Sequence, residues 1–387
     1  MKILLVSMPS LHFFRWTEQL ENSGHDVYWF DIVDGNPTNR LPWVSKINGW
    51  RIKYSKLKGR YFIKNRLPYL YALLEPLIER NVANQFEKSL IRIQPDIVHS
   101  FAMQISCVPI IDVMQKYPKQ KWVYSSWGSD LYNLKSVNLS IPQVKRALGR
   151  INYLITDCLR DYDLAKKYNF TGVYLGSIPG GGGYDYTKTN SYIITPNLKR
   201  NIILIKGYQG DLGRCNQVLL ALSAMRDELL DYQIIVFSAD KDVLRFIEKL
   251  KLDKKLNISV LKKETFLPHI EILKLMGKSL IYIGNSISDG MPNTLLEAII
   301  MGAYPIQSNP GGATAEVVTN NVNGTLIEDP ENIQYIQELI SNTILNHKLI
   351  KQAFEINQNE IKPKYRVEKI KKQVLEIYLK AHNETNN

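Results

Sequence analysis

Short apolar runs alternate with longer amphipathic stretches along most of the chain. Residues 2–7 form the first apolar run, and residues 13–22 follow with helical spacing of apolar positions before Gly24 ends the pattern. Runs this short predict buried strands, and the spacing of the longer stretches predicts helices packed on one face. Strands that alternate with helices favour a parallel sheet covered on both faces.

The same alternation continues through both halves of the chain. In the first half it predicts further strands at 27–31, 96–99 and 122–125 and a helix at 109–115. In the second half it predicts strands at 202–205, 233–237, 258–261, 280–283 and 304–307, helices at 216–230 and 294–301, and a helical tail over 330–381. Four glycines at 180–183 separate the halves, either as a hinge or as a loop where the backbone approaches another group closely. The 387 residues therefore predict two doubly wound α/β domains, with a ligand cleft between them at the carboxyl ends of their sheets.

Composition narrows the class of protein. The chain is 45% hydrophobic and 22% charged, as in folded globular proteins, and no apolar stretch reaches the roughly 18–20 residues of a membrane-spanning helix. The apolar run after Met1 is too short for a signal peptide. The three cysteines are widely separated and form no Cys-x-x-Cys pair, which favours a reducing compartment and no zinc site. We therefore expect a cytoplasmic protein.

Charge is the exception in this composition. Lys and Arg number 49 and Asp and Glu number 37, so the formal net charge is +12. An excess of this size indicates an anionic partner, which is nucleic acid, a phosphorylated ligand or a membrane surface. The segment 40–66 contains no acidic residue, and its cations and aromatic residues are Arg40, Lys46, Arg51, Lys53, Lys56, Lys58, Arg60, Lys64 and Arg66, with Trp43, Trp50, Tyr54, Tyr61 and Phe62.

The stretch 288–316 combines a strand end, a tight loop and a helix start. Asp289 precedes the helix, which begins near Asn293, and Glu297 lies about one turn inside it. N–H groups at a helix start favour an anionic oxygen such as that of a diphosphate, and nearby carboxylates can accept hydrogen bonds from sugar hydroxyls. The alternative is that Asp289 only caps the helix and that Glu297 lies on a solvated face.

This stretch closely resembles the signature of the retaining, nucleotide-sugar-dependent glycosyltransferases of group 1, or family 4, which have the GT-B fold. In that family Glu-Gly-x-Pro is followed four residues later by Glu-Ala, then by a Gly and a Pro, and then by Gly-Gly-x-x-x-Glu. Asp289 stands here in place of the first Glu. The other positions match in order: Gly290, Pro292, Glu297, Ala298, Gly302, Pro305, Gly311, Gly312 and Glu316. So many fixed spacings make a strong signal.

The resemblance implies a role for each part of this stretch. Glu297 would bind the ribose hydroxyls of the nucleotide, and Asp289 would face the transferred sugar. Asp is one methylene shorter than Glu, so its reach toward the sugar is shorter. The loop and helix start that would meet the diphosphate consist of Gly290, Met291, Pro292, Asn293 and Thr294.

A second part of the resemblance is the loop 206–214, between a predicted strand and a predicted helix. The family carries an Arg and a Lys in this loop, and their charges neutralise the departing diphosphate. Arg214 fits that role because a planar guanidinium binds two phosphate oxygens at once. Lys206 and Lys262 are further candidate phosphate ligands, and Tyr208 stands where the family often has Arg. For each cation the alternative is an ordinary surface position.

In the N-terminal half the resemblance rests on two strand ends. Residues 96–100 resemble the family's Asp-hydrophobic-hydrophobic-His pattern, and residues 126–130 resemble its His-Gly-x-Asp turn with Trp127 in place of His. An indole can stack on a sugar but cannot exchange protons. His99 either compensates for this replacement or is a strand-end residue bonded to backbone. Asp130 either bonds to the acceptor or sugar or caps the turn that follows.

The resemblance implies a GT-B enzyme in three parts. These are an acceptor-side Rossmann-like domain over 1–183, a nucleotide-sugar-binding Rossmann-like domain over 184–362, and a C-terminal helix over 363–387 that packs back on the first domain. The implied reaction is hexosyl transfer from a nucleotide sugar, with UDP the expected carrier, to a hydroxyl of a glycan or lipid-linked glycan. It retains the anomeric configuration and fits cell-surface polysaccharide synthesis. No metal and no further cofactor are expected, because a helix start and cations stabilise the leaving phosphate.

Many relatives act on lipid-linked acceptors, which suggests a role for the segment 40–66. Lys and Arg near an anionic leaflet contribute about 1 kcal/mol each, and Trp and Tyr prefer the interface. We therefore expect peripheral contact with the inner face of the cell membrane through this segment, the alternative being a solvated basic loop.

Two other functions are open. A nucleotide-sugar epimerase of the same fold would need proton-exchanging groups around the sugar. A non-catalytic basic module would bind a membrane or nucleic acid, but the chain has no recognisable nucleic-acid-binding motif beside its charge. We therefore expect no nucleic-acid partner.

Overall fold

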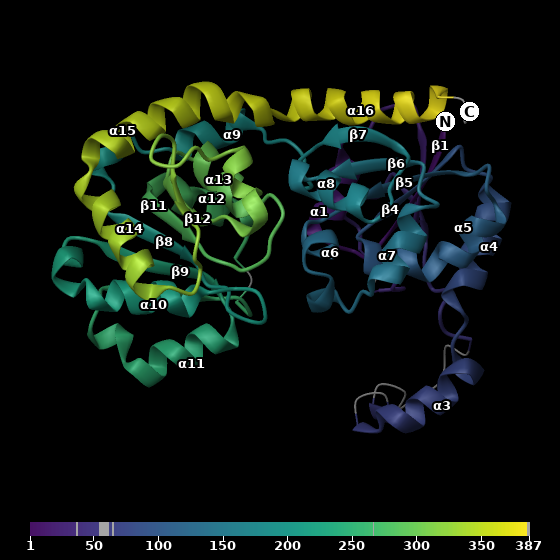
Figure 1. Cartoon of the computed structure of the whole chain (residues 1–387), viewed down its shortest axis with the longest axis horizontal. Coiled ribbons are helices and arrows are strands. Elements are labelled where there is room, and N and C mark those ends of the chain that lie inside the picture. The colour runs from purple at the N-terminus through teal and green to yellow at the C-terminus, as the bar shows by residue number, and fades with distance from the viewer. Residues whose placement is uncertain (36–37, 54–61, 64–65, 266, 385–387) are drawn as a thin grey trace. The chain divides into compact units, whose positions relative to one another are not determined.

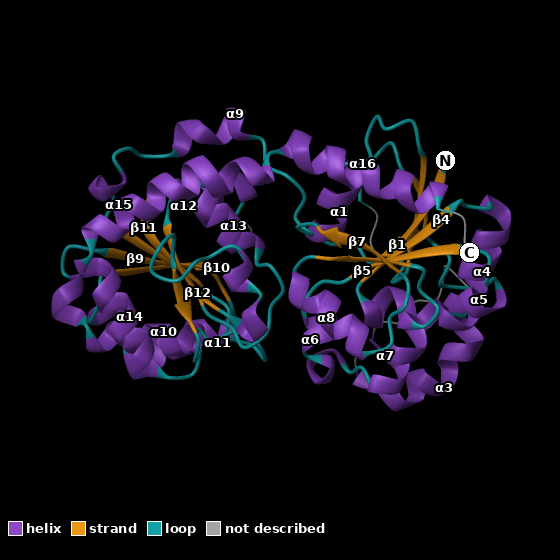
Figure 2. Ribbon diagram, turned by 45° about the horizontal axis from the view of Figure 1, so that its top comes forward, coloured by secondary structure: helices purple, strands orange, loops and turns teal. Residues whose placement is uncertain are grey.

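A computed structural model describes the chain except for residues 36–37, 54–61, 64–65, 266 and 385–387 (Figure 1). The chain divides into two compact units. The first unit contains Met1–Thr156, Tyr162–Gly181 and Lys371–Asn387, and the second contains Asp157–Asp161 and Gly182–Ile370. Each unit has its own parallel sheet with helices on both faces (Figure 2).

The sheet of the first unit has seven parallel strands in the order β3-β2-β1-β4-β5-β6-β7. They are β1 (Lys2–Ser7), β2 (Asp26–Asp31), β3 (Ser45–Ile47), β4 (Ile97–Phe101), β5 (Lys121–Ser125), β6 (Tyr153–Thr156) and β7 (Val173–Ser177). The register pairs Leu4 with both Tyr28 and Val98. Because both faces of the sheet are covered, the central strands are apolar along nearly their whole length, as the sequence pattern indicated.

Helices cover the first sheet on both faces (Figure 2). They are α1 (Leu11–Glu18), α4 (Val82–Ile93), α5 (Ile111–Lys116), α6 (Ser129–Tyr132), α7 (Ile141–Leu148), α8 (Leu159–Lys167), whose first residues belong to the second unit, and the part of α16 (Val367–Asn383) from Lys371 onward. Inside this unit Trp16 Nε1 donates to Tyr378 Oη at 3.0 Å, and Lys121 Nζ donates to the carbonyl of Ala381 at 3.0 Å. Val374, Ile377 and Tyr378 are buried, so this apolar face of the last helix packs on the first unit.

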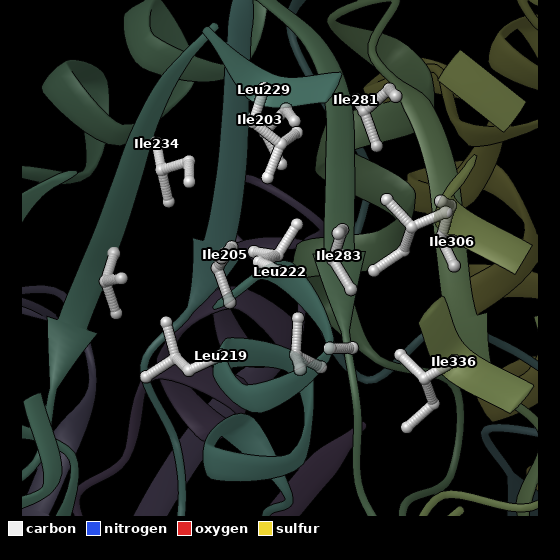
Figure 3. Close-up of a cluster of buried hydrophobic side chains, with 14 of the residues drawn as sticks. Ile203, Ile205, Leu219, Leu222, Leu229, Ile234, Ile281, Ile283, Ile306 and Ile336 are labelled. Carbon is white, nitrogen blue, oxygen red and sulfur yellow. The ribbon is translucent and has the colours of Figure 1, made fainter. Parts of the chain in front are cut away.

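The sheet of the second unit has six parallel strands in the order β10-β9-β8-β11-β12-β13. They are β8 (Ile202–Lys206), β9 (Gln233–Ala239), β10 (Ile258–Lys262), β11 (Ser279–Gly284), β12 (Tyr304–Ser308) and β13 (Thr325–Ile327). The helices are α9 (Tyr186–Thr189), α10 (Cys215–Ala224), α11 (Lys241–Leu250), α12 (His269–Lys278), α13 (Asn293–Ile300), α14 (Ile333–Leu345) and α15 (His347–Ile356). Figure 3 shows Ile203, Ile205 and Ile283 of the sheet among leucines of the helical layer, and burial of each such side chain stabilises the unit by about 1.5–3 kcal/mol.

The strands predicted from the sequence all occur, with ends shifted by one or two residues. Four further strands, β3, β6, β7 and β13, were missed because they are three to five residues long and two of them are only half-buried. The helix predicted over 216–230 ends at Ala224, since Met225 leaves helical geometry at φ −107° and ψ 22°.

The glycine run lies where the two units divide, between Gly181 and Gly182. A Cβ on Gly183 would lie 2.4 Å from the Cα of Val367, and Tyr184 N donates to the carbonyl of Tyr365 at 2.9 Å. Close approach of another backbone segment therefore explains Gly183, which was one of the two interpretations of the run.

Among the residues that the structure describes, no helix combines the length and the hydropathy that crossing a bilayer requires.

Candidate functional site

In the second unit the loops after β8 and β11 leave adjacent strands at the point where the strand order reverses. Loops at such a switch point form a crevice at the carboxyl edge of the sheet, where α/β proteins bind ligands. The loop after β8 contains residues 207–214, and the loop after β11 leads through Asp289 and Gly290 to α13. The two segments singled out in the sequence therefore lie side by side.

The start of α13 has the properties of an anion site. Its N-cap residue, Pro292, offers no side-chain hydrogen bond to the first helical amides. Just before it, Gly290 N donates to Asp289 Oδ1 at 3.0 Å, and Met291 N donates to Asp157 Oδ2 at 3.2 Å. The sequence predicted that these two amides would bind a diphosphate. In the structure both donate hydrogen bonds to carboxylate oxygens, so their geometry suits an anionic acceptor.

Asp157 also explains the glycine in this loop. A Cβ on Gly290 would lie 2.1 Å from Asp157 Oδ2, closer than any real contact. Asp157 was not predicted from the sequence, because it lies more than a hundred residues upstream and belongs to no local pattern. In the structure Asp157 belongs to the second unit, together with the loop that contains Gly290.

Asp289 and Lys206 meet at the carboxyl edge of the sheet. Lys206 is the last residue of β8, and its Nζ lies 4.0 Å from Asp289 Oδ2. The two side chains are 29% and 31% exposed, so both are accessible to a ligand. The site prediction for both residues is consistent with this placement and stays a prediction.

Arg214 is the N-cap residue of α10 and is mostly buried in the loop after β8. Its Nε donates to Glu331 Oε1 at 2.8 Å, and one terminal nitrogen donates to the carbonyl of Gly213 at 2.7 Å. Glu331 is 62% exposed, so this ion pair contributes little to stability and can be exchanged for a ligand. Lys262 ends the edge strand β10, two strands away from β8, so the fold does not bring it next to Lys206.

Glu297 lies inside α13 with a side chain that is only 4% exposed. Its Oε1 is 2.7 Å from Nε2 of His269, the first residue of α12, which is 36% exposed. The alternative that Glu297 lies on a solvated face is therefore wrong. His269 was missed in the sequence because nothing local connects it to a carboxylate 28 residues later.

Thr294 and Tyr282 make a further contact at the start of α13. Tyr282 Oη on β11 donates to Thr294 Oγ1 at 2.8 Å, and burial raises the pKa of Tyr282. The tyrosine therefore stays protonated and fixes the orientation of the threonine hydroxyl.

Arg160 connects two parts of the family signature. One terminal nitrogen of its buried guanidinium donates to the carbonyls of Asp289 at 2.8 Å and Pro310 at 2.6 Å. The carboxylate of Glu316 accepts hydrogen bonds from the backbone N–H groups of Leu159 at 2.8 Å and Arg160 at 3.2 Å. Arg160, like Asp157 and His269, was missed in the sequence, and it holds the Asp289 loop in place.

One group of potential metal ligands occurs in the described part of the chain. Side-chain atoms of Asp157, Cys158 and Asp161 lie within 4.8 Å of one another. Asp161 already pairs with the guanidinium of Arg160 at 2.8 Å, and burial raises the pKa of the Cys158 thiol. A protonated thiol beside a neutralised carboxylate is poorly suited to a divalent cation.

In the first unit Asp130 and His99 are both buried. Asp130 Oδ1 accepts from Trp127 N at 2.9 Å, and Oδ2 accepts from Met103 N at 2.8 Å and Tyr124 Oη at 2.6 Å. Asp130 thus fixes the turn that carries Trp127, which favours the structural alternative for this residue. A direct role in catalysis stays a prediction.

His99 bonds to side chains rather than to backbone. Its Nδ1 is 2.6 Å from Tyr378 Oη and its Nε2 is 2.8 Å from Ser125 Oγ. Burial lowers the pKa of His99 to about 3. A neutral ring with both nitrogens engaged and no exposed surface favours a packing role over proton transfer, and its predicted catalytic role is not tested by these contacts.

The first unit also contains a groove of about 1320 Å³. Its walls include Ile32 and Val33, which follow β2, and Gln104 and Ile105, which follow β4. Its lining also contains the cations Arg51, Lys53, Arg80 and Lys88 and the acids Glu75, Glu79 and Glu87. The groove therefore lies at the carboxyl edge of the first sheet and offers apolar contacts together with charges of both signs.

Two family models match the chain. Residues 191–356 match the group 1 glycosyl transferases, and residues 2–158 match the glycosyl transferase 4-like proteins. With two doubly wound parallel sheets, the chain is a glycosyltransferase of the GT-B fold, and the predicted fold class is confirmed.

Solved structures with the same fold cover almost the whole chain. A glycosyltransferase from Rickettsia africae ESF-5 is 20% identical over 99% of both chains, with a TM-score of 0.66. Sucrose-phosphate synthase from Thermosynechococcus elongatus is 12% identical over 98% of both chains, with a TM-score of 0.72. HepE from Anabaena in complex with UDP-glucose is 14% identical over 98% of this chain and 100% of that chain, with a TM-score of 0.69. A comparison with curated proteins found no match.

Proposed function

We propose that this glycosyltransferase moves a hexosyl group from a UDP-sugar to a hydroxyl of a glycan or lipid-linked glycan, with retention, in cell-surface polysaccharide synthesis. The observation that carries the proposal is the buried carboxylate of Glu297. It lies one turn inside a helix whose N-cap side chain makes no hydrogen bond to the first helical amides. Such a carboxylate can accept from two ribose hydroxyls while the helix start faces the diphosphate. The likeness to HepE, whose structure holds UDP-glucose, supports UDP as the carrier.

The proposed reaction breaks the bond between the sugar C1 and the diphosphate and forms a bond between C1 and the acceptor oxygen. The acceptor proton moves to the leaving diphosphate. Negative charge grows on that diphosphate, so Lys206 at the end of β8 and Arg214 in the loop that follows stabilise the transition state more than the ground state. Asp289, in the loop after β11, would face the transferred sugar.

Product analysis tests the reaction as a whole. We expect UDP release that depends on both donor and acceptor, and NMR of the product should show the anomeric configuration of the donor. Inverted product would contradict retention. Interconversion of the UDP-sugar without net UDP release would instead identify the epimerase alternative.

Arg214→Ala should lower kcat/KM for the donor by about 10²–10³-fold, because it removes a charged donor aimed at the leaving diphosphate. Arg214→Lys should recover part of this loss, since a point charge replaces a bidentate one. Glu331→Ala is the matched control: it removes the present partner of Arg214 and should leave donor KM unchanged or lower it. A loss in Glu331→Ala as large as in Arg214→Ala would show that the ion pair only maintains the loop.

The proposed chemistry draws its positive charge from the helix start and side-chain cations. UDP release should therefore be unchanged by excess EDTA, measured after passage over a chelating resin. A loss of activity that Mg²⁺ or Mn²⁺ restores would contradict a metal-independent mechanism.

A further inference from the structure

Helix α3 (Pro68–Ile78) of the first unit has an apolar outer surface. Tyr69 is 89% exposed, Leu73 76% and Leu77 65%. Its most exposed residues are apolar or aromatic: Pro68, Tyr69, Leu70, Ala72, Leu73, Pro76 and Leu77. Glu75, whose side chain is 46% exposed, is the one acid of the helix. In Figure 1 this helix stands away from the sheet of its unit. A contiguous apolar surface of this kind marks an interaction site.

The orientation of α3 is fixed by contacts on its inner side. Tyr71 is buried, and its hydroxyl donates to the carboxylate of Glu79. Arg51 pairs with the same carboxylate, and Lys53 N donates to the carbonyl of Ile78 at 2.9 Å. The leucines therefore face outward because the other side of the helix is tied to the unit.

The charge around this apolar surface is positive. Arg51 pairs with Glu79 and lies 3.7 Å from Glu75, so its single charge offsets one of these two acids. Lys53, Arg66 and Arg80 outweigh the other. Arg66 precedes the helix and Arg80 follows it, and one terminal nitrogen of Arg80 donates to the carbonyls of Trp50 and Ile52, which carry no net charge. Cations thus flank the apolar surface at both ends.

We propose that α3 inserts its apolar surface into an anionic membrane, with Lys53, Arg66 and Arg80 at the level of the headgroups. This rests on the proposed function, because a lipid-linked acceptor would be held in a membrane. An eleven-residue helix is too short to span a bilayer but suits the interface. A second copy of the chain fits the surface less well, because a two-fold contact through α3 would bring the same cations together.

This assignment places the main apolar anchor outside the segment 40–66, in which Phe62, at 65%, is the most exposed of the described aromatic residues. Trp50 is buried and stacks on Phe30 at 5.3 Å, and Lys46 lies over Trp29 with a side chain only 16% exposed. These two residues are thus engaged with the first unit. Lys56, Lys58, Arg60, Lys64, Tyr54 and Tyr61 lie outside the described residues.

Insertion of α3 would also place the groove of the first unit next to the membrane. Ala72 and Pro76 of α3 line that groove together with Arg51 and Lys53. A helix embedded at the interface would therefore hold the mouth of the groove next to the headgroups. A lipid-linked acceptor could then reach it without leaving the bilayer.

Co-sedimentation with vesicles tests the proposal on the full chain. Wild-type protein should bind vesicles of phosphatidylcholine and phosphatidylglycerol, and binding should weaken with pure phosphatidylcholine or at high salt. The double variant Leu73→Glu/Leu77→Glu should lower the partition coefficient by more than about tenfold. The matched control is Leu230→Glu/Leu345→Glu in the second unit, where the leucines are 72% and 74% exposed, and it should bind like wild type.

UDP affinity, measured by isothermal titration without vesicles, separates this proposal from the proposed function. The α3 variant should bind UDP like wild type, because neither leucine belongs to the nucleotide site. Equal vesicle binding by the α3 variant and the control would overturn the proposal. So would a wild-type dimer in light scattering that becomes a monomer in the α3 variant, since a second copy would then cover α3.

Discussion

Glu297→Ala should weaken UDP binding by at least about 10- to 150-fold and lower donor-dependent UDP release correspondingly. A hydrogen bond to a charged group contributes about 1.5–3 kcal/mol, so loss of one ribose bond gives this range and loss of both exceeds it. The loss should appear in KM for the donor as well as in kcat/KM, since the ribose is bound throughout the reaction. Isothermal titration with UDP measures the affinity directly.

Two further variants make this experiment selective for the nucleotide. Glu297→Gln keeps an oxygen within reach of His269 Nε2, so it should preserve the local packing and still weaken UDP binding. Glu338→Ala removes an exposed carboxylate from α14 and should bind UDP like wild type. Wild-type UDP affinity in Glu297→Ala, with unchanged circular dichroism, would reject the site assignment.

The sequence predicted the fold well because both sheets are covered on both faces. Strands in that position are apolar throughout, so β1, β8 and β11 are recognisable as short unbroken runs. The edge strands β7 and β13 lack this property, being half-buried or three residues long. Helix α3 is an exception to the link between apolar sequence and burial. An apolar segment of this kind usually indicates a buried element, but most of its side chains are exposed.

The candidate site was predictable only where its residues are close in sequence. Asp289 and Glu297 belong to one loop and one helix, so their spacing alone places them at the same sheet edge. Their structural partners come from elsewhere in the chain: Arg160 holds the Asp289 carbonyl, and His269 holds the Glu297 carboxylate. Such long-range contacts depend on strand order, which no local pattern encodes.

His99 should make the first unit sensitive to mild acid. Its pKa is about 3 in the folded chain because of burial, against an ordinary value of 6.5. Above pH 6.5 neither the folded nor the unfolded state protonates this ring, so it adds no pH dependence. As pH falls below 6.5 the unfolded state binds a proton that the folded state does not, and stability declines until the pH approaches 3.

The expected size of this effect is about 1.4 kcal/mol per pH unit, or about 3 kcal/mol between pH 6.5 and 4. Tryptophan fluorescence reports the first unit alone, because all six tryptophans lie within residues 16–127. Urea unfolding followed by fluorescence at several pH values therefore measures the free energy of unfolding of the unit that contains His99.

His99→Gln removes the titrating ring and keeps polar atoms near Tyr378 and Ser125. We expect this variant to be less stable than wild type at pH 7 but to lose less stability on acidification, so that the two profiles converge toward pH 4. His347→Gln, at an exposed position of the second unit, should reproduce the wild-type profile. Parallel profiles for wild type and His99→Gln would show that folding does not lower the pKa of His99, and the proton-exchanging role considered for this residue would then regain support.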